Sequence, residues 1–496
     1  MNPEKIKLLH SRYNPQGEAE RYISSLSLNE SIRFLILIEP GLGYMVAPLR
    51  KKLPSAKIIA LHAEANPEGE AGINGPEAPD SEWHPGMGIP VQDFLEREIP
   101  DVEAAELRIL EWRPALSVYG GAYRALVEGA VEFIKRTDAN TRTLKNFGGS
   151  WFRNFFKNLG IIRKILCPLP LSQPLLVTGA GPGLEDTIHL IKNSPPGTGG
   201  RGIFFILAAS SSAAALEAAD LKADLVISTD GGNWARLHLY ECYRKGEPNL
   251  AVSLTAALPS QCESSPVLPI CDGSLWQTLI LRELKIPFIV LPQRGTVSAS
   301  ALDLAFALTK GDIFIAGMDL SNRDIRSHVR PYSLDFLLEE KAGRLNPVYS
   351  QSYRRSSMLK AGGSYGIYAS WFEKQLPSYP RRLHSLGKNN PLFNSLENTG
   401  LPFDKTTVPD PVQFETLTLK YEENPSIKAL AVLEKALTDP RCPAKLPEEL
   451  GALLFPGRER PSAKELIDTL HSLAGRYRAK PPAGRTKEKE GFHPNG

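Results

Sequence analysis

The chain has 496 residues, of which 42% are hydrophobic and 23% are charged, proportions typical of a soluble globular protein with more than one domain. Lys and Arg number 58 against 55 Asp and Glu, so the formal net charge is +3. A surplus this small argues against nucleic acid or an anionic membrane surface as a partner.

The sequence lacks the usual signals for export or membrane insertion. The opening residues, MNPEKIKLLHSRYNP, contain no apolar core of signal-peptide length, and the most apolar stretch is interrupted by Glu39 and Pro40. The five cysteines are scattered and form no CxxC pair, which suits a reducing compartment and predicts neither a disulfide framework nor a zinc site. We therefore expect a cytoplasmic protein with no metal ligands of this type.

Residues 1–114 alternate between strand and helix patterns. Ser31–Ile38 and Lys57–Leu61 are apolar runs typical of buried parallel strands. The turn Glu39–Gly43 between them resembles the opening of a nucleotide or S-adenosylmethionine site, with Glu64 as a ribose ligand, but Val46 stands where a third glycine is expected. We predict a Rossmann-like N-terminal domain, and the pattern leaves open whether it binds a cofactor.

Residues 115–170 have an amphipathic pattern and are predicted to form a helical connector. Its aromatic cluster follows near-helical spacing, which favours packing in a core over binding of a partner; the cluster consists of Trp151, Phe152, Phe155 and Phe156.

Residues 171–380 alternate short apolar runs with Ala- and Leu-rich helix formers, which predicts an α/β central domain with a doubly wound parallel sheet. The predicted strands are Leu175–Thr178, Ile203–Leu207, Leu225–Ser228, Ala251–Leu254, Phe288–Leu291 and Ile313–Ala316. After residue 380 the strand pattern is lost. Residues 381–479 are predicted to form a helical C-terminal region, with helices near Ser426–Asp439 and Ser462–Tyr477, and residues 480–496 a disordered tail.

A glycine-rich turn follows the first strand of the central domain. The predicted helix begins directly after it, at Leu184 or Glu185. Glycines allow a phosphate to approach the backbone, and the amino end of a helix offers free N–H groups. The residues predicted to contact a nucleotide here are Gly179, Gly181, Pro182 and Gly183. The alternative interpretation is a tight turn with no ligand.

Two further strand ends carry polar residues. Asp230 follows the strand Leu225–Ser228, with Asn233 shortly after it, and Asp319 follows the strand Ile313–Ala316. A carboxylate in this position can bind a ribose, a metal ion or an acceptor hydroxyl, and a helix cap or turn is the structural alternative. Because the strands are predicted to be parallel, Asp230 and the glycine turn are expected at the same edge of the sheet.

The loop after Asp319 is rich in basic residues. Arg323 and Arg326 are candidates for holding phosphate, although a solvated basic loop explains such arginines equally simply. His328 lies in a polar loop after a core strand, where catalytic groups are common, and it is the first candidate for a general acid or base. Asp230, Asp319 and His328 are thus the predicted catalytic residues.

The order of four stretches resembles the motility-associated Maf family, whose central region is also described as similar to the archaeal 6-hydroxymethylpterin diphosphokinase MptE. The stretches span roughly residues 10–330 and are NPQGEAERYI with ILIEPGLGY, TRTLKNFGGSWFRNFFKNLG, VTGAGPGLEDTI and AGMDLSNRDIRSHV. Two features depart from the family pattern. Gly183 stands where a serine is expected, and SNRDIRSHV replaces a tract rich in threonine and glycine.

The resemblance implies a central domain similar to the sialyltransferases that use CMP-activated sugars. The turn Gly179–Gly183 would hold the nucleotide, Asp230 and Asn233 would line the donor site, and His328 would lie near the transfer chemistry. The implied reaction moves a nonulosonic acid, such as pseudaminic or legionaminic acid, from its CMP-activated donor to Ser or Thr of flagellin. A base takes the acceptor proton, and Arg323 or Arg326 stabilises the leaving phosphate. The resemblance implies no tightly bound cofactor.

Two other functions stay open. An MptE-like enzyme would transfer pyrophosphate from ATP to 6-hydroxymethylpterin, with Mg²⁺ held by Asp230 and Asp319. A flagellar accessory protein would keep the fold without turnover, and Gly183 in place of serine favours that interpretation. The sequence does not indicate an oligomeric state.

Overall fold

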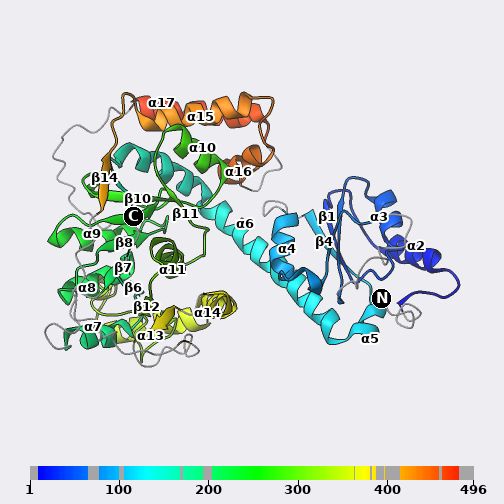
Figure 1. Ribbon diagram of the computed structural model, residues 1–496, viewed down its shortest axis with the longest axis horizontal. Coiled ribbons are helices and arrows are strands. Elements are labelled where there is room, and N and C mark those ends of the chain that lie inside the picture. Colours follow the sequence, from blue (N-terminus) through cyan, green and yellow to red (C-terminus); the bar gives the residue numbers. More distant parts are fainter. Residues whose placement is uncertain are drawn as a thin grey trace. The chain divides into compact units, whose positions relative to one another are not determined.

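A computed structural model describes residues 9–64, 78–99, 106–167, 171, 173–193, 204–361, 364–379, 382–386, 396, 414–456 and 461–479. The chain divides into two units, Met1–Asn146 and Phe147–Gly496, and each is treated by itself (Figure 1). The predicted tail, residues 480–496, lies outside the described residues. Within the described part of the chain, no helix has both the length and the apolar character needed to cross a bilayer.

The smaller unit is built on a parallel sheet of order β3-β2-β1-β4. Its strands are β1 (Phe34–Ile38), β2 (Lys57–Leu61), β3 (Ser81–Trp83) and β4 (Leu107–Glu111). Its helices are α2 (Pro15–Ser25), α3 (Val46–Lys52), α4 (Val91–Glu98), α5 (Pro114–Tyr119) and the first part of α6 (Gly121–Ile161). All five side chains of β1 are buried, as the apolar run predicts. The predicted Rossmann-like arrangement is confirmed, and β2 has the predicted bounds.

The larger unit contains a ten-stranded sheet of order β13-β12-β6-β7-β8-β9-β10-β5-β14, with β11 beside β10. All pairs are parallel except β14 with β5. The strands are β5 (Lys164–Cys167), β6 (Leu175–Thr178), β7 (Phe205–Ala209), β8 (Leu225–Ser228), β9 (Leu250–Ser253), β10 (Pro266–Cys271), β11 (Ile289–Val290), β12 (Ile313–Ala316), β13 (Leu383–Ser385) and β14 (Glu415–Thr418). The predicted doubly wound parallel sheet is confirmed.

Helices connect the strands of this sheet and extend beyond it. They are α7 (Leu184–Lys192), α8 (Ala213–Ala218), α9 (Ala235–Cys242), α10 (Leu275–Glu283), α11 (Val297–Leu308), α12 (Phe336–Glu340), α13 (Val348–Ala361), α14 (Ser364–Gln375), α15 (Pro425–Thr438), α16 (Lys445–Leu454) and α17 (Ala463–Ala479). The two helices predicted near the C-terminus correspond to α15 and α17.

The strand order places a topological switch point between β6 and β12. The chain passes outward from β6 through β7, β8 and β9 on one side, whereas β12 pairs with β6 on the other. In open α/β sheets, ligands bind outside the carboxyl ends of the strands at such a point. The glycine turn after β6 and the loop after β12 therefore face each other where a ligand site is expected.

The sheet reaches beyond residues 171–380 at both ends. β5 comes from the segment predicted to be a helical connector, and β13 and β14 follow Tyr379, after which no strand is predicted. These three strands have only three or four residues each, and all four side chains of β14 are exposed. β13 and β14 are the edge strands and β5 is next to β14, so these strands do not have the long, fully buried apolar runs of the sheet centre. β10 was also not predicted, because Pro266 and Pro269 interrupt its apolar run.

One carboxylate joins the C-terminal helices to the sheet unit. Helices α10, α15, α16 and α17 lie side by side (Figure 1). Ser274 at the amino end of α10 makes no side-chain cap, and Glu449 of α16 takes its place: its two oxygens accept hydrogen bonds from the backbone N–H groups of Leu275 and Trp276, each at 3.1 Å. A cap supplied by another helix stabilises α10 and holds α16 against it.

We predict that Glu449→Ala destabilises this helix group by about 1 kcal/mol, because two N–H groups lose their acceptor. Hydrogen exchange of the Leu275 and Trp276 amides should accelerate. Lys445→Gln is the control, since the exposed Lys445 ammonium lies 3.7 Å from Glu449 Oε1 and its removal leaves the cap in place. Equal exchange in the two variants would show that the ion pair, and not the cap, stabilises α10.

Candidate functional site

The glycine turn after β6 is occupied by a carboxylate of the chain itself. The Gly183 N–H donates a hydrogen bond of 2.6 Å to Asp319 Oδ2. A Cβ atom on Gly181 or on Gly183 would overlap with the Asp319 carboxylate. Burial raises the pKa of Asp319, while the Gly183 amide and Arg323 act in the opposite direction. The turn therefore has the predicted anion-binding form, with α7 beginning at Leu184, and the anion that it binds is Asp319.

This geometry explains why Gly183 replaces the serine expected from the Maf resemblance. Gly183 has φ −66°, a value that any residue adopts, so its backbone does not require glycine. The space that a serine side chain would need at this position is taken by Asp319. A serine would have to displace the carboxylate from the turn.

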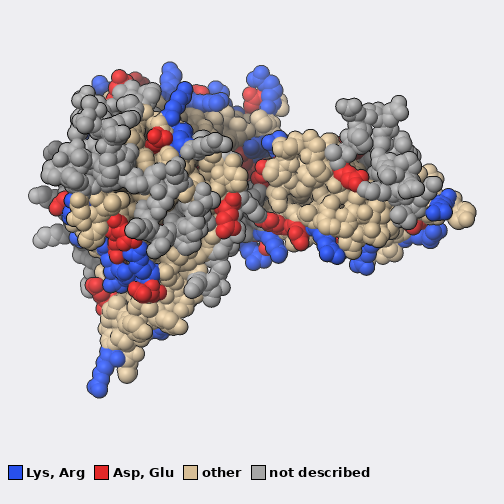
Figure 2. Space-filling model, turned by 60° about the horizontal axis from the view of Figure 1, so that its bottom comes forward, with Lys and Arg blue, Asp and Glu red and all other residues tan. Residues whose placement is uncertain are grey.

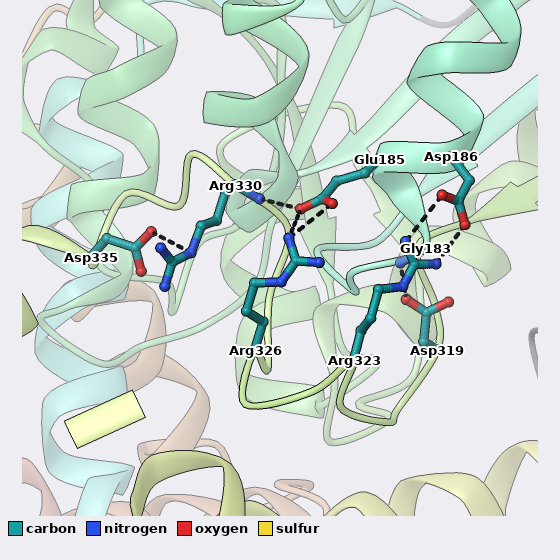
Figure 3. A network of polar contacts seen from close by, with 8 residues as sticks. All are labelled: Gly183, Glu185, Asp186, Asp319, Arg323, Arg326, Arg330 and Asp335. Atoms are coloured by element: carbon teal, nitrogen blue, oxygen red, sulfur yellow. Dashed lines mark hydrogen bonds and ion pairs between the residues drawn. The ribbon is translucent and has the colours of Figure 1, made fainter. Parts of the chain in front are cut away.

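The loop after β12 is held against the start of α7 by ion pairs (Figure 3). Arg323 Nη1 donates to Asp186 Oδ1 at 3.0 Å, and Arg326 Nη1 donates to both oxygens of Glu185 at 3.0 Å. Because both guanidinium groups are already bound to carboxylates, they position the loop. The sequence could not reveal these ion pairs, because the partners lie 137 and 141 residues away in the chain. The role of the two arginines as phosphate ligands stays a prediction.

The backbone of the same loop also contacts the glycine turn. The Val329 N–H donates to the Ala180 carbonyl at 2.9 Å, and the Arg330 N–H donates to Glu185 Oε1 at 3.2 Å. His328, which lies between these contacts and the ion pairs, is consequently placed at the carboxyl edge of β6 and β12. The sequence predicted this edge for His328.

His328 belongs to a stacked cluster with Tyr332 and His238. Its ring stacks on that of Tyr332, with centroids 4.2 Å apart and an interplanar angle of 17°. The centroid of the His238 ring lies 5.3 Å from that of Tyr332, at an interplanar angle of 46°. Burial, with a further contribution from Arg355, lowers the pKa of His328 to about 3 and that of His238 to about 4. Both imidazoles are therefore neutral near pH 7. His328 Nδ1 lies 2.8 Å from Ser327 Oγ, and His238 Nδ1 contacts Ser333 Oγ.

Asp230 is exposed at the carboxyl end of β8, and Asn233 is exposed nearby. Asp230 Oδ1 accepts a hydrogen bond of 2.7 Å from the Gly232 N–H, the turn contact that was the structural alternative. Its charge also contributes, after burial, to the raised pKa values of Tyr332 and Tyr368. Asp230 thus faces the same side as the His328 cluster, as the parallel order of β6, β7 and β8 predicted.

Two asparagines of α6 support the loops that follow β8 and β9. Asn158 Nδ2 donates to the carbonyls of Leu254 and Ala256, both at 2.8 Å. Asn154 Nδ2 donates to Gly231 O at 3.3 Å and to Thr255 O at 3.1 Å. Spaced four residues apart, they lie on one face of the helix. Sequence analysis noted this tract only through the Maf resemblance and assigned the two asparagines no role.

The neighbouring aromatic residues of α6 behave largely as predicted. Phe152, Phe155 and Phe156 are buried. Trp151 is only partly buried, and it packs on Gly231, where a Cβ atom would overlap with the indole ring. The bare backbone of Gly231 therefore lets the Asp230 loop lie directly on this helix.

The glycine turn of the smaller unit is covered by an imidazole. His10 Nε2 accepts a hydrogen bond of 3.0 Å from the Leu42 N–H, and the His10 ring fills the space beside Gly41. Glu39 is buried, and its Oε2 accepts from the Ala63 N–H at 2.6 Å. His10 and Glu39 thus take up the position in which the Rossmann-like pattern would place a cofactor.

Charge on the visible face of the molecule is mixed. Figure 2 shows Lys and Arg side chains interspersed with Asp and Glu over the residues drawn there. Among the described residues, no group of three or more His, Cys, Asp or Glu side chains is arranged to hold a metal ion.

Comparison with known proteins supports the predicted resemblance of the central domain to the MptE-like family. Residues 151–324 match the family described as 6-hydroxymethylpterin diphosphokinase MptE-like, which confirms that part of the predicted resemblance. An uncharacterized protein of Treponema pallidum (strain Nichols) is 25% identical over 246 residues, which cover 49% of this chain and 52% of that protein. The chain thus spans about half the length of this relative. A solved Maf glycosyltransferase from Magnetospirillum magneticum AMB-1 is similar at 12% identity and a TM-score of 0.43, over 93% of this chain and 82% of that one.

We predict that Gly183→Ala destabilises the protein by about 1–3 kcal/mol, because the new methyl group overlaps with Asp319. The cost should be smaller in an Asp319→Ala background, which a double-mutant cycle of unfolding free energies would measure. Gly475→Ala is the control, since open space surrounds this position in α17. A destabilisation by Gly183→Ala that is the same in both backgrounds would contradict the proposed packing.

Acid is predicted to destabilise the larger unit through His238, which is buried, and His328, which is partly buried. Their folded pKa values, about 3 for His328 and about 4 for His238, lie below the unfolded value, so only the unfolded chain takes up these protons just below pH 6.5. Stability contributed by the neutral rings is complete above pH 6.5. It then falls by about 1.4 kcal/mol per pH unit for each histidine until its folded pKa is reached.

Urea unfolding at several pH values between 6.5 and 4.5 measures this slope. His238→Gln should make the slope shallower by about one proton, because one buried titrating group is removed. His471→Gln is the matched control on the exposed surface of α17. If His238→Gln and His471→Gln changed the slope equally, the burial argument would be wrong.

Proposed function

We propose that the larger unit is a transferase that uses a CMP-activated acidic sugar as donor. The observation that carries the proposal is the position of Asp230 and His328 at the carboxyl edge of a doubly wound sheet. Asp230 lies within residues 151–324, which match the MptE-like family, and His328 follows four residues after this segment. The order of motifs that resembles the Maf family supports a nonulosonic acid as the sugar and a Ser or Thr of flagellin as the acceptor. No tightly bound cofactor is needed for this reaction.

The two catalytic candidates have different tasks in this proposal. Asp230 is an exposed carboxylate, so an acceptor hydroxyl can reach it and give up its proton as the hydroxyl oxygen attacks the anomeric carbon. The bond from that carbon to the CMP phosphate breaks, and CMP leaves with the electron pair. His328, held neutral by burial, donates a hydrogen bond to the phosphate oxygens through the ring N–H that remains free.

Asp319 has a positioning role. Its carboxylate joins the loop after β12 to the start of α7, and this loop carries His328. The ion pairs of Arg323 and Arg326 act in the same way. The proposed donor site therefore uses Asn233 and the outer surface of the turn Gly179–Gly183, while the inner surface is closed by Asp319.

The pyrophosphokinase activity is the second candidate, because the description of the matching family names it. It requires ATP with Mg²⁺ and a pterin acceptor, whereas sugar transfer requires CMP and no metal ion for binding. Calorimetric titration with CMP, with ATP and Mg²⁺, and with 6-hydroxymethylpterin separates the two activities. Binding of CMP alone supports the proposal, binding of the ATP and pterin pair supports the alternative, and absence of all binding supports an accessory protein.

Asp230→Asn is predicted to reduce release of CMP from CMP-activated nonulosonic acids by about 10²- to 10⁴-fold, because proton transfer from the acceptor loses its base. CMP affinity should change little, since the amide keeps the hydrogen bond from Gly232. Asp312→Asn is the matched control: it is exposed and precedes β12, at the opposite edge of the sheet. Full activity of Asp230→Asn would rule out the base role.

A further inference from the structure

A polar pocket lies between the loop after β12 and the helix α13. Ser327, His328 and Arg330 line it from the loop, and Ser352 and Arg355 line it from α13. His328 therefore shares this pocket with residues of a helix. None of the sequence motifs includes α13.

The pocket carries one more positive charge than negative charge. Three arginines line it: Arg326 is bound to Glu185 at 3.0 Å, and Arg330 Nε lies 3.8 Å from Asp335 Oδ2 (Figure 3). The third, Arg355, has no ion pair within the described part of the chain. Three guanidinium groups thus meet two carboxylates, which leaves the charge of Arg355 for a ligand.

Arg355 is held in place by an aromatic ring. Its Cζ atom lies 5.4 Å from the centroid of the Tyr332 ring, on which His328 also stacks. A contact of this kind orients the guanidinium group. Arg355 also forms a side-chain hydrogen bond with Tyr332, and the other N–H groups of the guanidinium are left for a ligand. Arg355 and His328 consequently both contact the Tyr332 ring.

Ser352, one turn before Arg355 on α13, provides a second and independent indication of a ligand. Its side chain is only 5% exposed, and its Oγ has no hydrogen-bond partner among the described residues. A buried hydroxyl without a partner costs free energy unless a ligand or water supplies one. Because Ser352 lines the pocket beside Arg355, its hydroxyl can donate to the same bound group.

We propose that the pocket of Arg355 and Ser352 binds an oxyanion of the substrate and presents it to His328. The inference rests on the proposed function and deepens it, because a CMP-activated acidic sugar has two such groups, the phosphate and the sugar carboxylate. The glycine turn cannot take this role while Asp319 fills it. In this proposal the anion therefore binds beside helix α13 and not in the turn after β6.

Binding of four probes to Arg355→Gln tests the proposal. The probes are CMP, cytidine, N-acetylneuraminic acid and inorganic pyrophosphate, measured by calorimetry against the unaltered protein. The variant should weaken binding of the anion that Arg355 holds by about ten- to a hundredfold and leave cytidine unchanged. Loss of CMP affinity identifies the phosphate as the bound group, and loss of affinity for the acidic sugar identifies the carboxylate.

Three companion variants define the controls. Arg354→Gln removes the neighbouring exposed arginine, which bonds to Ser350 O, and should change every affinity less than about twofold. Arg355→Lys keeps the charge against Tyr332 and should give an intermediate loss, which excludes misfolding as the cause. Ser352→Ala should weaken the same probe as Arg355→Gln.

The outcomes separate this inference from the proposed function. Unchanged CMP and sugar affinities in Arg355→Gln would overturn the anion site and leave the transferase proposal intact. If the unaltered protein bound neither CMP nor the sugar, the transferase proposal would fail. The anion site would then stand only if pyrophosphate bound and Arg355→Gln abolished that binding, and pyrophosphate binding that persisted in the variant would overturn it.

Discussion

The hydrogen bond between the Gly183 amide and the Asp319 carboxylate is the contact on which the site geometry depends. It joins the turn after β6 to the loop after β12, the two sides of the topological switch point. In such folds the first turn commonly receives a phosphate from the ligand. Here the chain provides the negative charge itself, because the Asp319 carboxylate fills the turn.

This closure determines how the surrounding charges are used. With Asp319 in the turn, Glu185 and Asp186 at the start of α7 pair with Arg326 and Arg323 of the loop. Partly exposed pairs of this kind contribute little free energy individually, but together with the backbone contacts of Val329 and Arg330 they fix the path of the loop. Of the three arginines that line the pocket, Arg355, on a different element, then has no ion pair among the described residues.

The fold class and the edge of the sheet that carries the site can be predicted from the sequence. Buried parallel strands such as β6, β8 and β12 are visible there as apolar runs with polar residues at their ends. The pairing of Arg323 with Asp186 and that of Gly183 with Asp319 cannot be predicted from the sequence. In each pair the two residues lie far apart in the chain, by 137 and 136 residues. For the same reason the sequence shows Gly183 only as a departure from the family pattern, whereas in the fold it makes room for a carboxylate.

Arg355 shows a different limit of sequence analysis. It lies in α13, VYSQSYRRSSMLKA, where a solvated helix face is the natural interpretation of adjacent arginines. Only the fold shows that Arg354 points to backbone and side-chain acceptors on the surface, whereas Arg355 lies over the Tyr332 ring. The residue types alone do not show that two adjacent arginines of a helix point in different directions. That becomes visible only when the position of the Tyr332 ring is known.

The contacts of the loop after β12 distinguish the two possible anion sites. A phosphate that entered the glycine turn would have to displace Asp319. The segment that carries His328 is held independently of that carboxylate, because the Val329 N–H is bound to Ala180 O and the Arg323 and Arg326 ion pairs join the same loop to α7. An anion beside Arg355 displaces no carboxylate. The proposed site at α13 is therefore the one that is compatible with Asp319 in the turn and His328 in place.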